Sequence, residues 1–261
     1  MTVPDAAEML RLVDQNLREG YRQLVALAPG GEMLDADGVL CVANRSPSPV
    51  IVNTAFRTDP SVAADIALER IDAFYTVRAH GYSVYVADHG DADLAAAASS
   101  LGLEQVVELP AMVLDATPAP GSPGPGVTVQ QVVDRAGCSA FAAIMAESFT
   151  ESTGELFVEP ASLIGPNIGG WIAHVDGEPA AGASILISHG IGLVMTVGTL
   201  EAHRRRGLGD LVTRVAAQAA FERGARFVSL QSSPAGLGVY EGVGFRVVSA
   251  YRLYGRSAVA S

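Results

Sequence analysis

The chain has 261 residues, of which 49% are hydrophobic and 17% charged, and this composition excludes a largely disordered protein. Its 17 basic residues are all arginine and are outnumbered by 28 acidic ones, so the net charge of −11 argues against a nucleic-acid-binding protein. Two cysteines, Cys41 and Cys138, are too few and too distant for a disulfide framework or a metal site, so we expect reduced thiols, a cytoplasmic protein and no bound metal.

The first part of the chain, residues 1–116, predicts a domain of its own that begins with a long helix. Its start, MTVPDAAEMLR, is acidic and lacks an apolar core, so we expect no signal peptide. The elements expected from apolar periodicity are a helix over 5–27, strands at 38–43 and 50–56, a helix at 64–75, a strand at 82–87, a helix at 92–102 and a closing strand pair within 103–115.

A linker follows at residues 117–126, TPAPGSPGPG, because four prolines and three glycines in ten residues cannot pack as helix or sheet. It separates residues 1–116 from a second domain, residues 127–261. The elements expected there are a strand at 126–133, a helix at 137–149, a hairpin over 169–188 with an Asp-Gly turn, a strand at 191–200, a helix from 208 to 223, a strand at 226–230, a short helix at 234–243, and strands at 245–250 and 251–255.

One apolar stretch resembles a membrane span, Pro179–Leu200, whose only ionisable residue is His189. Its glycines and the HGIG break favour two short buried strands joined by a turn, so we expect no membrane association.

The two domains also resemble each other in element order. Laying 92–104 over 235–246 aligns Gly102 with Gly244 and Ala98 with Tyr240, which indicates an internal duplication.

The segment TLEAHRRRGLGDLV, residues 199–212, predicts an anion-binding site between a strand and a helix. Glycines let the backbone approach a ligand closely, and the first helical turn offers unpaired amides and the positive end of the helix dipole. Arginine side chains add charge-assisted hydrogen bonds. A solvated arginine run is the alternative, but cations are disfavoured beside a helix N-terminus, so we interpret the cluster as the docking point of a polyanion such as a pyrophosphate.

Two motifs carry a resemblance to a known family. RRRGLG, residues 204–209, resembles the [RQ]-x-x-G-x-[GA] motif of the GNAT superfamily of acyl-CoA-dependent N-acetyltransferases, and GVYEGVGFR, residues 238–246, is similar to its second signature. The resemblance covers essentially all of residues 127–261. It implies an α/β (α+β) protein with two GNAT-like domains, each a mixed, mostly antiparallel sheet flanked by helices.

The resemblance also implies roles for individual residues. Val197 and Thr199 match positions whose backbone pairs with the pantetheine arm of acetyl-CoA, and Gly198 between them would permit a bulge. Tyr240 matches the frequent general acid, although a packing aromatic is the alternative. The pyrophosphate would be held at the motif's opening residue and at the backbone amides after it: Arg204, Arg205, Arg206, Gly207, Leu208, Gly209 and Asp210.

Some positions depart from the family pattern. Glu201 stands where the family often has proline, and Ser233 stands where it often has asparagine, so Ser233 would replace a coenzyme-binding amide only in part. Residues 1–116 lack the glycine-arginine motif and carry Ala98 opposite Tyr240. This domain therefore looks like a degenerate copy that supplies structure and a wall of the acceptor pocket.

The general base is not apparent from the sequence. Four carboxylates follow the first helix of the second domain, and each is either a base or amine-binding group or part of a solvated acidic loop: Glu147, Glu151, Glu155 and Glu159. Trp171 is interpreted as a core residue and His189 as a turn residue.

The resulting prediction is an acetyl-CoA-dependent N-acetyltransferase that acts on a small-molecule or peptide amine by direct transfer, without a metal. The alternatives are a non-catalytic acyl-CoA sensor or scaffold, and transfer to a thiol-sugar amine as in tandem GNAT enzymes of low-molecular-weight thiol synthesis. Nothing in the sequence selects the acceptor or the oligomeric state.

Overall fold

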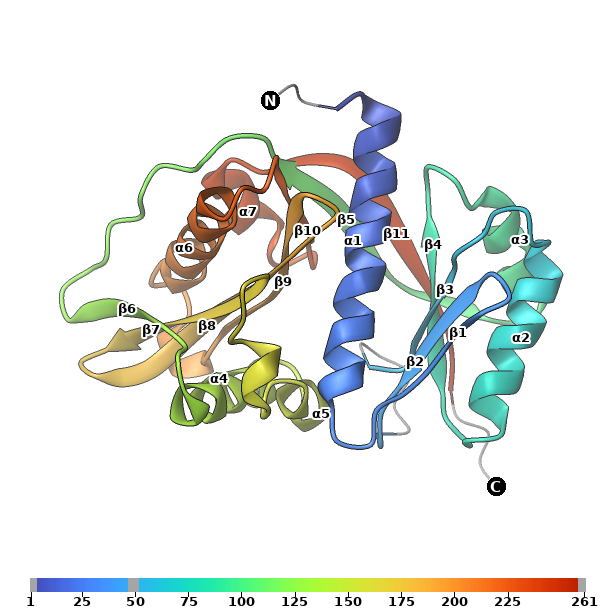
Figure 1. Ribbon diagram of the computed structural model, residues 1–261, viewed down its shortest axis with the longest axis horizontal. Helices are drawn as coiled ribbons and strands as arrows, with labels where there is room; N and C mark the ends of the chain where they lie inside the picture. The colour runs from blue at the N-terminus through green and yellow to red at the C-terminus, as the bar shows by residue number, and fades with distance from the viewer. Residues whose placement is uncertain (1–3, 47–51, 258–261) are drawn as a thin grey trace.

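The computed structural model describes residues 4–46 and 52–257, and Figure 1 shows the order of its helices and strands. We call residues 4–116 the N-terminal half and residues 127–257 the C-terminal half. The N-terminal half contains α1 (Ala6–Leu27), β1 (Glu32–Ala36), β2 (Val39–Ala43), β3 (Thr54–Arg57), α2 (Ala64–Thr76), β4 (Tyr82–Ala87), α3 (Ala92–Ser100) and β5 (Glu104–Leu114). The C-terminal half contains β6 (Val127–Gln131), α4 (Arg135–Ser148), α5 (Glu151–Glu155), the 3₁₀ turn η1 (Pro160–Ser162), β7 (Ile168–Val175), β8 (Glu178–Ser188), β9 (Ile191–Thr199), the 3₁₀ turn η2 (Glu201–His203), α6 (Leu208–Glu222), β10 (Val228–Gln231), α7 (Leu237–Val243) and β11 (Arg246–Arg256).

The described strands join into one sheet with the order β1-β2-β3-β4-β11-β5-β10-β9-β8-β7-β6. Its pairings are antiparallel except for β3 with β4 and β9 with β10, which confirms the mixed, mostly antiparallel fold. In the N-terminal half α2 and α3 cover one face and α1 the other, and in the C-terminal half α6 and α4 lie on opposite faces (Figure 1).

The closing strands differ from the sequence prediction. Residues 246–256 form one strand, β11, where two were expected, and β5 is likewise a single strand where a pair was expected. Neither glycine nor proline stands where the break was expected, between Ala250 and Tyr251, and register shifts after Val247 and Leu253 let β11 bend without ending. Pro110 does not end β5, because its carbonyl still accepts a hydrogen bond from Ser232 N at 2.9 Å.

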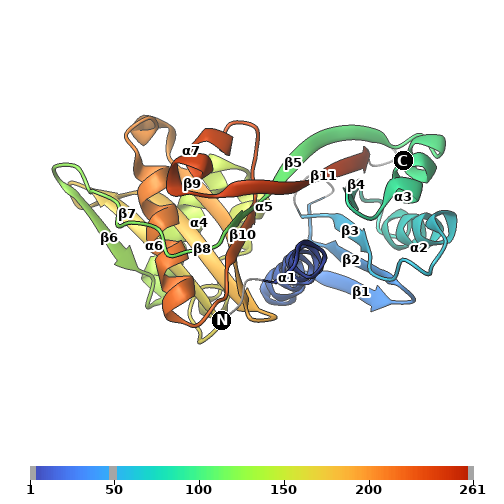
Figure 2. The same cartoon turned by 90° about the horizontal axis from the view of Figure 1, so that it is seen from above.

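The two long strands exchange partners between the halves. β11 lies between β4 and β5, and β5 lies between β11 and β10, so each half contributes one strand to the sheet of the other. Figure 2 shows β5 and β11 running side by side from one half to the other. The halves are therefore connected by a continuous hydrogen-bonded ladder in addition to the chain.

The turns expected from sequence occur where left-handed backbone is needed. Asp176 and Gly177, with φ of 51° and 91°, join β7 to β8, as the Asp-Gly turn predicted. His189 and Gly190, with φ of 53° and 74°, join β8 to β9, so Pro179–Leu200 is two strands and a turn. None of the helices in the described ranges is long and apolar enough to cross a membrane.

Helix α1 bridges the two halves and lies in the middle of the molecule (Figure 2). It begins where the Asp5 carboxylate accepts a hydrogen bond from Glu8 N at 2.9 Å. Asn16, which is fully buried, donates to Ser188 Oγ at 2.7 Å. On the opposite half, the Tyr21 hydroxyl lies 2.9 Å from that of Tyr85. Polar contacts thus hold α1 against both halves of the sheet.

Residues 117–126 contain no helix or strand, as the composition predicted, and the segment arcs from β5 over the outside of the C-terminal half to β6 (Figure 1). It is held along α6, since Pro118 O accepts from Gln218 and Ala119 O from Arg214.

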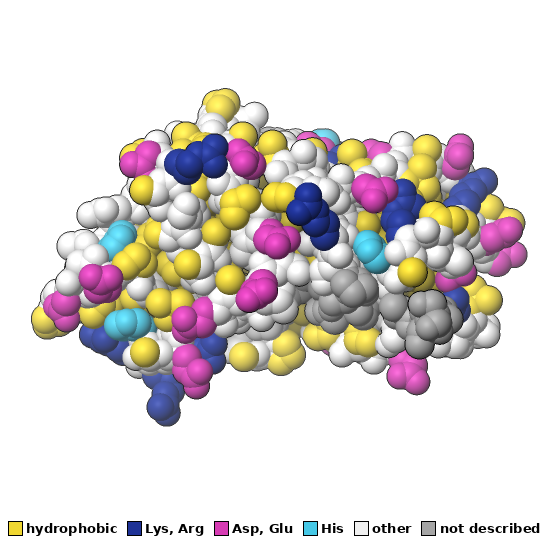
Figure 3. Space-filling view, turned by 90° about the horizontal axis from the view of Figure 1, so that it is seen from below, with side chains coloured by type: hydrophobic (Ala, Val, Ile, Leu, Met, Phe, Trp, Pro, Cys, Tyr) yellow, Lys and Arg dark blue, Asp and Glu magenta, His cyan; other side chains and the backbone are white. Residues whose placement is uncertain are grey.

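On the face shown in Figure 3, arginines are scattered among acidic side chains. The expected strand at 50–56 is shorter, with β3 at Thr54–Arg57, and its first two residues lie outside the described ranges.

Candidate active site

Strands β9 and β10 separate after a short parallel contact. Their pairing joins Val228 to Gly192 and Ser229 to Leu193. Beyond it, a cavity of about 680 Å³ opens, lined by Val194–Thr199 of β9 and by Leu230 and Gln231 of β10. The edge of β9 that faces this cavity is available to pair with an extended ligand, as an added strand would.

The bulge in β9 lies at Met195 and not at Gly198, which corrects the sequence prediction. On the β8 side, the register shifts between the pairs Ser184–Thr196 and Ile185–Val194, so Met195 is the extra residue. Gly198 instead pairs with Gly182 and gives α4 room to pack. A Cβ at Gly198 would lie 2.8 Å from both Met145 Cε and Ser148 Oγ.

The arginine-glycine loop lies at one end of this cavity. Arg205 and Gly207 have φ of 61° and 75°, and this left-handed backbone turns the chain sharply into α6. The first-turn residues Leu208, Gly209 and Asp210 line the cavity, and the amides of a first turn have no partner within their own helix. Gly207 is the N-cap and has no side chain with which to occupy them.

The three arginines occupy different positions. Arg204 and Arg205 line the cavity, and Arg204 Nε donates to Thr199 O at 3.2 Å. Arg206 is not among the lining residues, and its NH1 lies 3.2 Å from His203 Nδ1. Val197, Thr199, Ser233 and Tyr240 line the same cavity, so every residue expected at the coenzyme site except Arg206 meets there.

Asp210 is neutralised by an ion pair with Arg214. The Arg214 guanidinium donates to the two Asp210 carboxylate oxygens at 2.7 and 3.1 Å and to Gly242 O at 2.6 Å. This arrangement ties α6 to α7. It also removes the repulsion that an unpaired carboxylate would exert on an anion at the start of α6.

Tyr240 projects from α7 into the cavity and is half-buried. Its ring packs edge-on against Phe245, with 6.1 Å between centroids. Burial raises the pKa of Tyr240 to about 12, so the phenol is protonated at neutral pH. α7 begins beside Ser233, whose Oγ accepts from Gly236 N at 3.2 Å.

The other end of the cavity is built by the N-terminal half and by the segment around α5. It is mostly apolar, and its principal lining residues are Leu17, Leu24, Val25, Leu109, Leu156 and Leu193. The four glutamates considered as bases lie outside this lining; Glu147 Oε1 accepts from Glu201 N at 3.2 Å, and Glu159 pairs with Arg135 at 3.4 Å. Of the described lining residues, Asp210 is the one with a carboxylate.

Two polar groups at the cavity were missed from the sequence. Gln231 Nε2 and Ser148 Oγ are buried atoms without a hydrogen-bond partner among the described residues, and both residues line the cavity. The position of Gln231, a polar residue directly after the apolar strand expected at 226–230, is the signal that could have found it. Ser148 ends α4 and carries no such signal.

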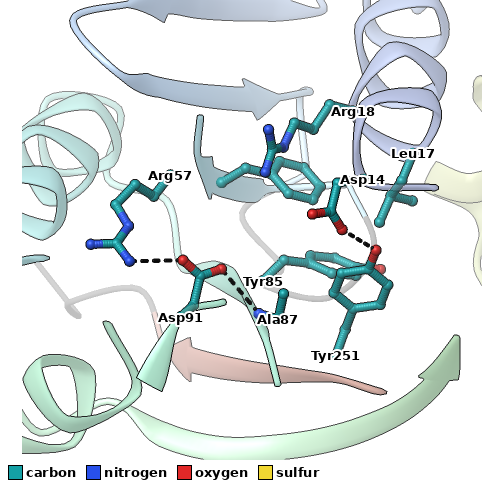
Figure 4. Close-up of a pocket in the computed structure, with 9 residues that line it drawn as sticks. Asp14, Leu17, Arg18, Arg57, Tyr85, Ala87, Asp91 and Tyr251 are labelled. Carbon is teal, nitrogen blue, oxygen red and sulfur yellow. Dashed lines mark hydrogen bonds and ion pairs between the residues drawn. The ribbon is translucent and has the colours of Figure 1, made fainter. Parts of the chain in front are cut away.

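The corresponding place in the N-terminal half is closed by an ion-pair network. Arg57, which is 4% exposed at the end of β3, pairs with Asp91 at 2.8 Å and with Asp93 at 2.7 Å. Figure 4 shows Arg57 pointing toward Asp91, beside a space of about 10 Å³ that holds at most about one water. Within the described residues, the place in the N-terminal half that corresponds to the cavity between β9 and β10 is therefore filled by side chains.

One segment of the C-terminal half matches a known family. Residues 138–245 match the family model described as acetyltransferase (GNAT) family. This segment is a GNAT acetyltransferase domain. The GNAT domain contains β9, the arginine-glycine loop, α6, β10 and α7, which surround the cavity. The elements that complete the apolar end, α1, β4 and β5, precede it in the chain.

Solved structures show that the fold extends over nearly the whole chain. A GCN5-related N-acetyltransferase from Kribbella flavida has 23% identity, covers 97% of this chain and 96% of its own, and has a TM-score of 0.72. One from Sphaerobacter thermophilus has 15% identity, covers 87% and 83%, and has a TM-score of 0.66. A tandem GNAT protein from the clavulanic acid biosynthesis pathway has 14% identity, covers 95% and 96%, and has a TM-score of 0.61. No curated protein matches this sequence.

Proposed function

We propose that this chain is an acetyl-CoA-dependent N-acetyltransferase that transfers an acetyl group directly to an amine in a ternary complex. In this proposal residues 127–261 are the catalytic domain, 117–126 the linker, and 1–116 a degenerate GNAT-like domain. The observation that carries it is one cavity lined by the separated edge of β9, the arginine-glycine loop and Tyr240. Cys41 and Cys138 are buried free thiols, which fits the cytoplasmic location that we propose.

The start of α6 fits the diphosphate of coenzyme A. The amides of Leu208, Gly209 and Asp210 can donate to phosphate oxygens, and Arg204 and Arg205 add two positive charges at the same end of the cavity. The Asp210 carboxylate does not oppose this binding, because Arg214 neutralises it. Arg206 would contribute through the field of the loop and through its backbone.

The edge of β9 fits the pantetheine arm. In this proposal the backbone at Val197 and Thr199 pairs with the amides of the arm, in the space left where β10 has separated. Thr199 O already accepts from Arg204 Nε, so pairing there requires this contact to be shared or exchanged. Ser233 also lines the cavity, and Gln231 Nε2, which has no partner within residues 4–46 and 52–257, is a further donor for the bound arm.

Acetyl-CoA supplies the acetyl group as a thioester when it is bound. The chain then orients the thioester along β9, and a strand amide polarises its carbonyl oxygen. Tyr240 donates its phenolic proton to the departing sulfur as the carbon–sulfur bond breaks. The proton that the attacking nitrogen loses restores the phenol, so that Tyr240 ends the cycle as it began.

A second candidate, an acyl-CoA-binding protein without catalysis, is favoured by one observation. Of the described residues lining the cavity, none is a histidine, and the carboxylate of Asp210 is engaged by Arg214. A binding protein needs no base, whereas an enzyme acting on a protonated amine does.

Calorimetry and a transfer assay separate these functions. We expect acetyl-CoA and coenzyme A to bind with Kd between about 1 µM and 1 mM, and acetyl transfer to some member of a broad amine panel to release free thiol. Binding without transfer to any amine would favour the non-catalytic function. Absence of heat at millimolar acetyl-CoA would refute both.

A further inference from the structure

The cavity has two chemically different ends, joined by β9. At the Thr199 end, Arg204 Nε contacts the strand. At the Leu193 end, α1 packs so closely that a Cβ on Gly20 would lie 2.9 Å from Leu193 Cδ2. Because a strand rises about 3.3 Å per residue, the two ends lie roughly 20 Å apart. A coenzyme with its diphosphate at the arginine end would direct its thioester toward the α1 end, where the acceptor must bind.

The acceptor end is lined by apolar side chains from both halves of the molecule. α1 contributes Leu17, Leu24 and Val25, β5 contributes Leu109, and the segment at α5 contributes Leu156. Phe149 also lines the cavity although it is 42% exposed, which places an apolar ring at its mouth. This composition favours a ligand with an apolar body over a hydrated one.

The polar groups at this end are neutral. The hydroxyls of Tyr21 and Tyr85 lie 2.9 Å apart, and burial raises the pKa of both, so neither supplies a negative charge at neutral pH. Thr153 is another polar lining residue there, whereas Ser148 faces Gly198, beside the arginine end. Among the described residues, no Asp, Glu, His or Arg lines the acceptor end. A bound ammonium would therefore lose its hydration without gaining a counter-ion.

We propose that the acceptor is a weakly basic amine, uncharged at neutral pH and carried on an apolar aliphatic or aromatic body. This inference rests on the proposed function and specifies its substrate class. The amine nitrogen forms a bond to the thioester carbon, the carbon–sulfur bond breaks, the sulfur gains a proton and the nitrogen loses one. Because such an amine arrives without an extra proton, the reaction needs no base, and none is found among the described residues at this end.

Three small amines test the proposal on the full-length protein. 4-Butylaniline is apolar and neutral at pH 7, 4-phenylbutylamine is of similar size but cationic, and aniline lacks the apolar chain. We expect kcat/KM for 4-butylaniline to exceed the values for each of the other two by about tenfold or more. Preference for 4-phenylbutylamine, or for the hydrophilic cation spermidine, would overturn the proposal.

Substitutions at the acceptor end test the assignment of the site. Leu24→Asp should shift the kcat/KM ratio about tenfold toward 4-phenylbutylamine, whereas the neutral Leu24→Asn should not. Because Leu24 is buried, a second variant at the exposed mouth is needed: Phe149→Asn should lower kcat/KM for 4-butylaniline several-fold, with Val133→Asn, 69% exposed and outside the lining, as its matched control. An unchanged ratio in folded Leu24→Asp and unchanged kcat/KM in Phe149→Asn would overturn the proposal.

Acetyl-CoA binding distinguishes this failure from that of the proposed function. If calorimetry detects acetyl-CoA and a hydrophilic amine is the better acceptor, the substrate class is wrong and the acetyltransferase function stands. If acetyl-CoA does not bind, the proposed function itself is wrong. Acetyl-CoA binding with no transfer to 4-butylaniline also overturns the substrate class, whatever other amine is acetylated.

Discussion

Replacing Tyr240 by phenylalanine removes one hydroxyl from the cavity and keeps the ring that packs against Phe245. We expect a small change in the free energy of unfolding and an unchanged Kd for acetyl-CoA, because the hydroxyl is proposed to act only as the thiolate leaves. kcat should fall about 100-fold, which corresponds to about 2.7 kcal/mol of activation free energy.

The raised pKa of Tyr240 gives this prediction a pH signature. With a pKa of about 12, about one phenol in 10⁵ is ionised at pH 7. The acid form is present below this pKa and is lost as the pH rises through it. Between pH 7 and 10 the wild-type kcat should therefore show no decline that is absent from Tyr240→Phe.

The assay measures free coenzyme A thiol under saturating acetyl-CoA, with calorimetry of acetyl-CoA binding to both proteins as the control. If kcat of the folded variant equals that of the wild type while Kd is also unchanged, Tyr240 is not the acid and is a packing residue. If Kd alone weakens, its hydroxyl binds the coenzyme and takes no part in the proton transfer.

Three further predictions concern the loop, the strand and the closed N-terminal site. Arg205→Ala should weaken acetyl-CoA binding about tenfold by calorimetry, and more than Arg206→Ala, since Arg206 does not line the cavity; equal losses would contradict the loop geometry. Gly198→Val should lower the free energy of unfolding in urea by about 1–3 kcal/mol, because the new side chain enters the space of α4; an unchanged midpoint would show that α4 adapts. Arg57→Met should cost about 2 kcal/mol of unfolding free energy. Arg57 lowers the pKa of Asp93, so this stabilisation is present above the ordinary carboxyl pKa and is lost as the pH falls. The unfolding free energies of the wild type and Arg57→Met should therefore converge at low pH, and a difference that persists there would refute the reasoning.

The local elements followed from the sequence because short-range patterns specify them. The Asp176-Gly177 turn needs left-handed backbone, and the β7–β8 hairpin forms there. The glycines and arginines at 204–209 stand between a strand and a helix, so their place at the start of α6 was predictable. The pairing of the closing strands was not predictable, because β5 and β11 each pair with strands of the other half, and no local sequence pattern encodes that pairing.

The lining of the proposed coenzyme end comes mostly from contiguous residues and could be predicted, whereas that of the proposed acceptor end could not. Only folding places α1 beside Leu193, which gives the cavity an apolar wall from residues far away in sequence. Folding also placed the bulge at Met195, kept Arg206 out of the lining and left Gln231 Nε2 without a hydrogen-bond partner among the described residues. The sequence by itself determined the fold class, the arginine-glycine turn before α6 and the absence of that motif from residues 1–116, because each depends on neighbouring residues. The tertiary structure decided the strand exchange and the apolar lining of the proposed acceptor end, because both depend on residues brought together from distant segments.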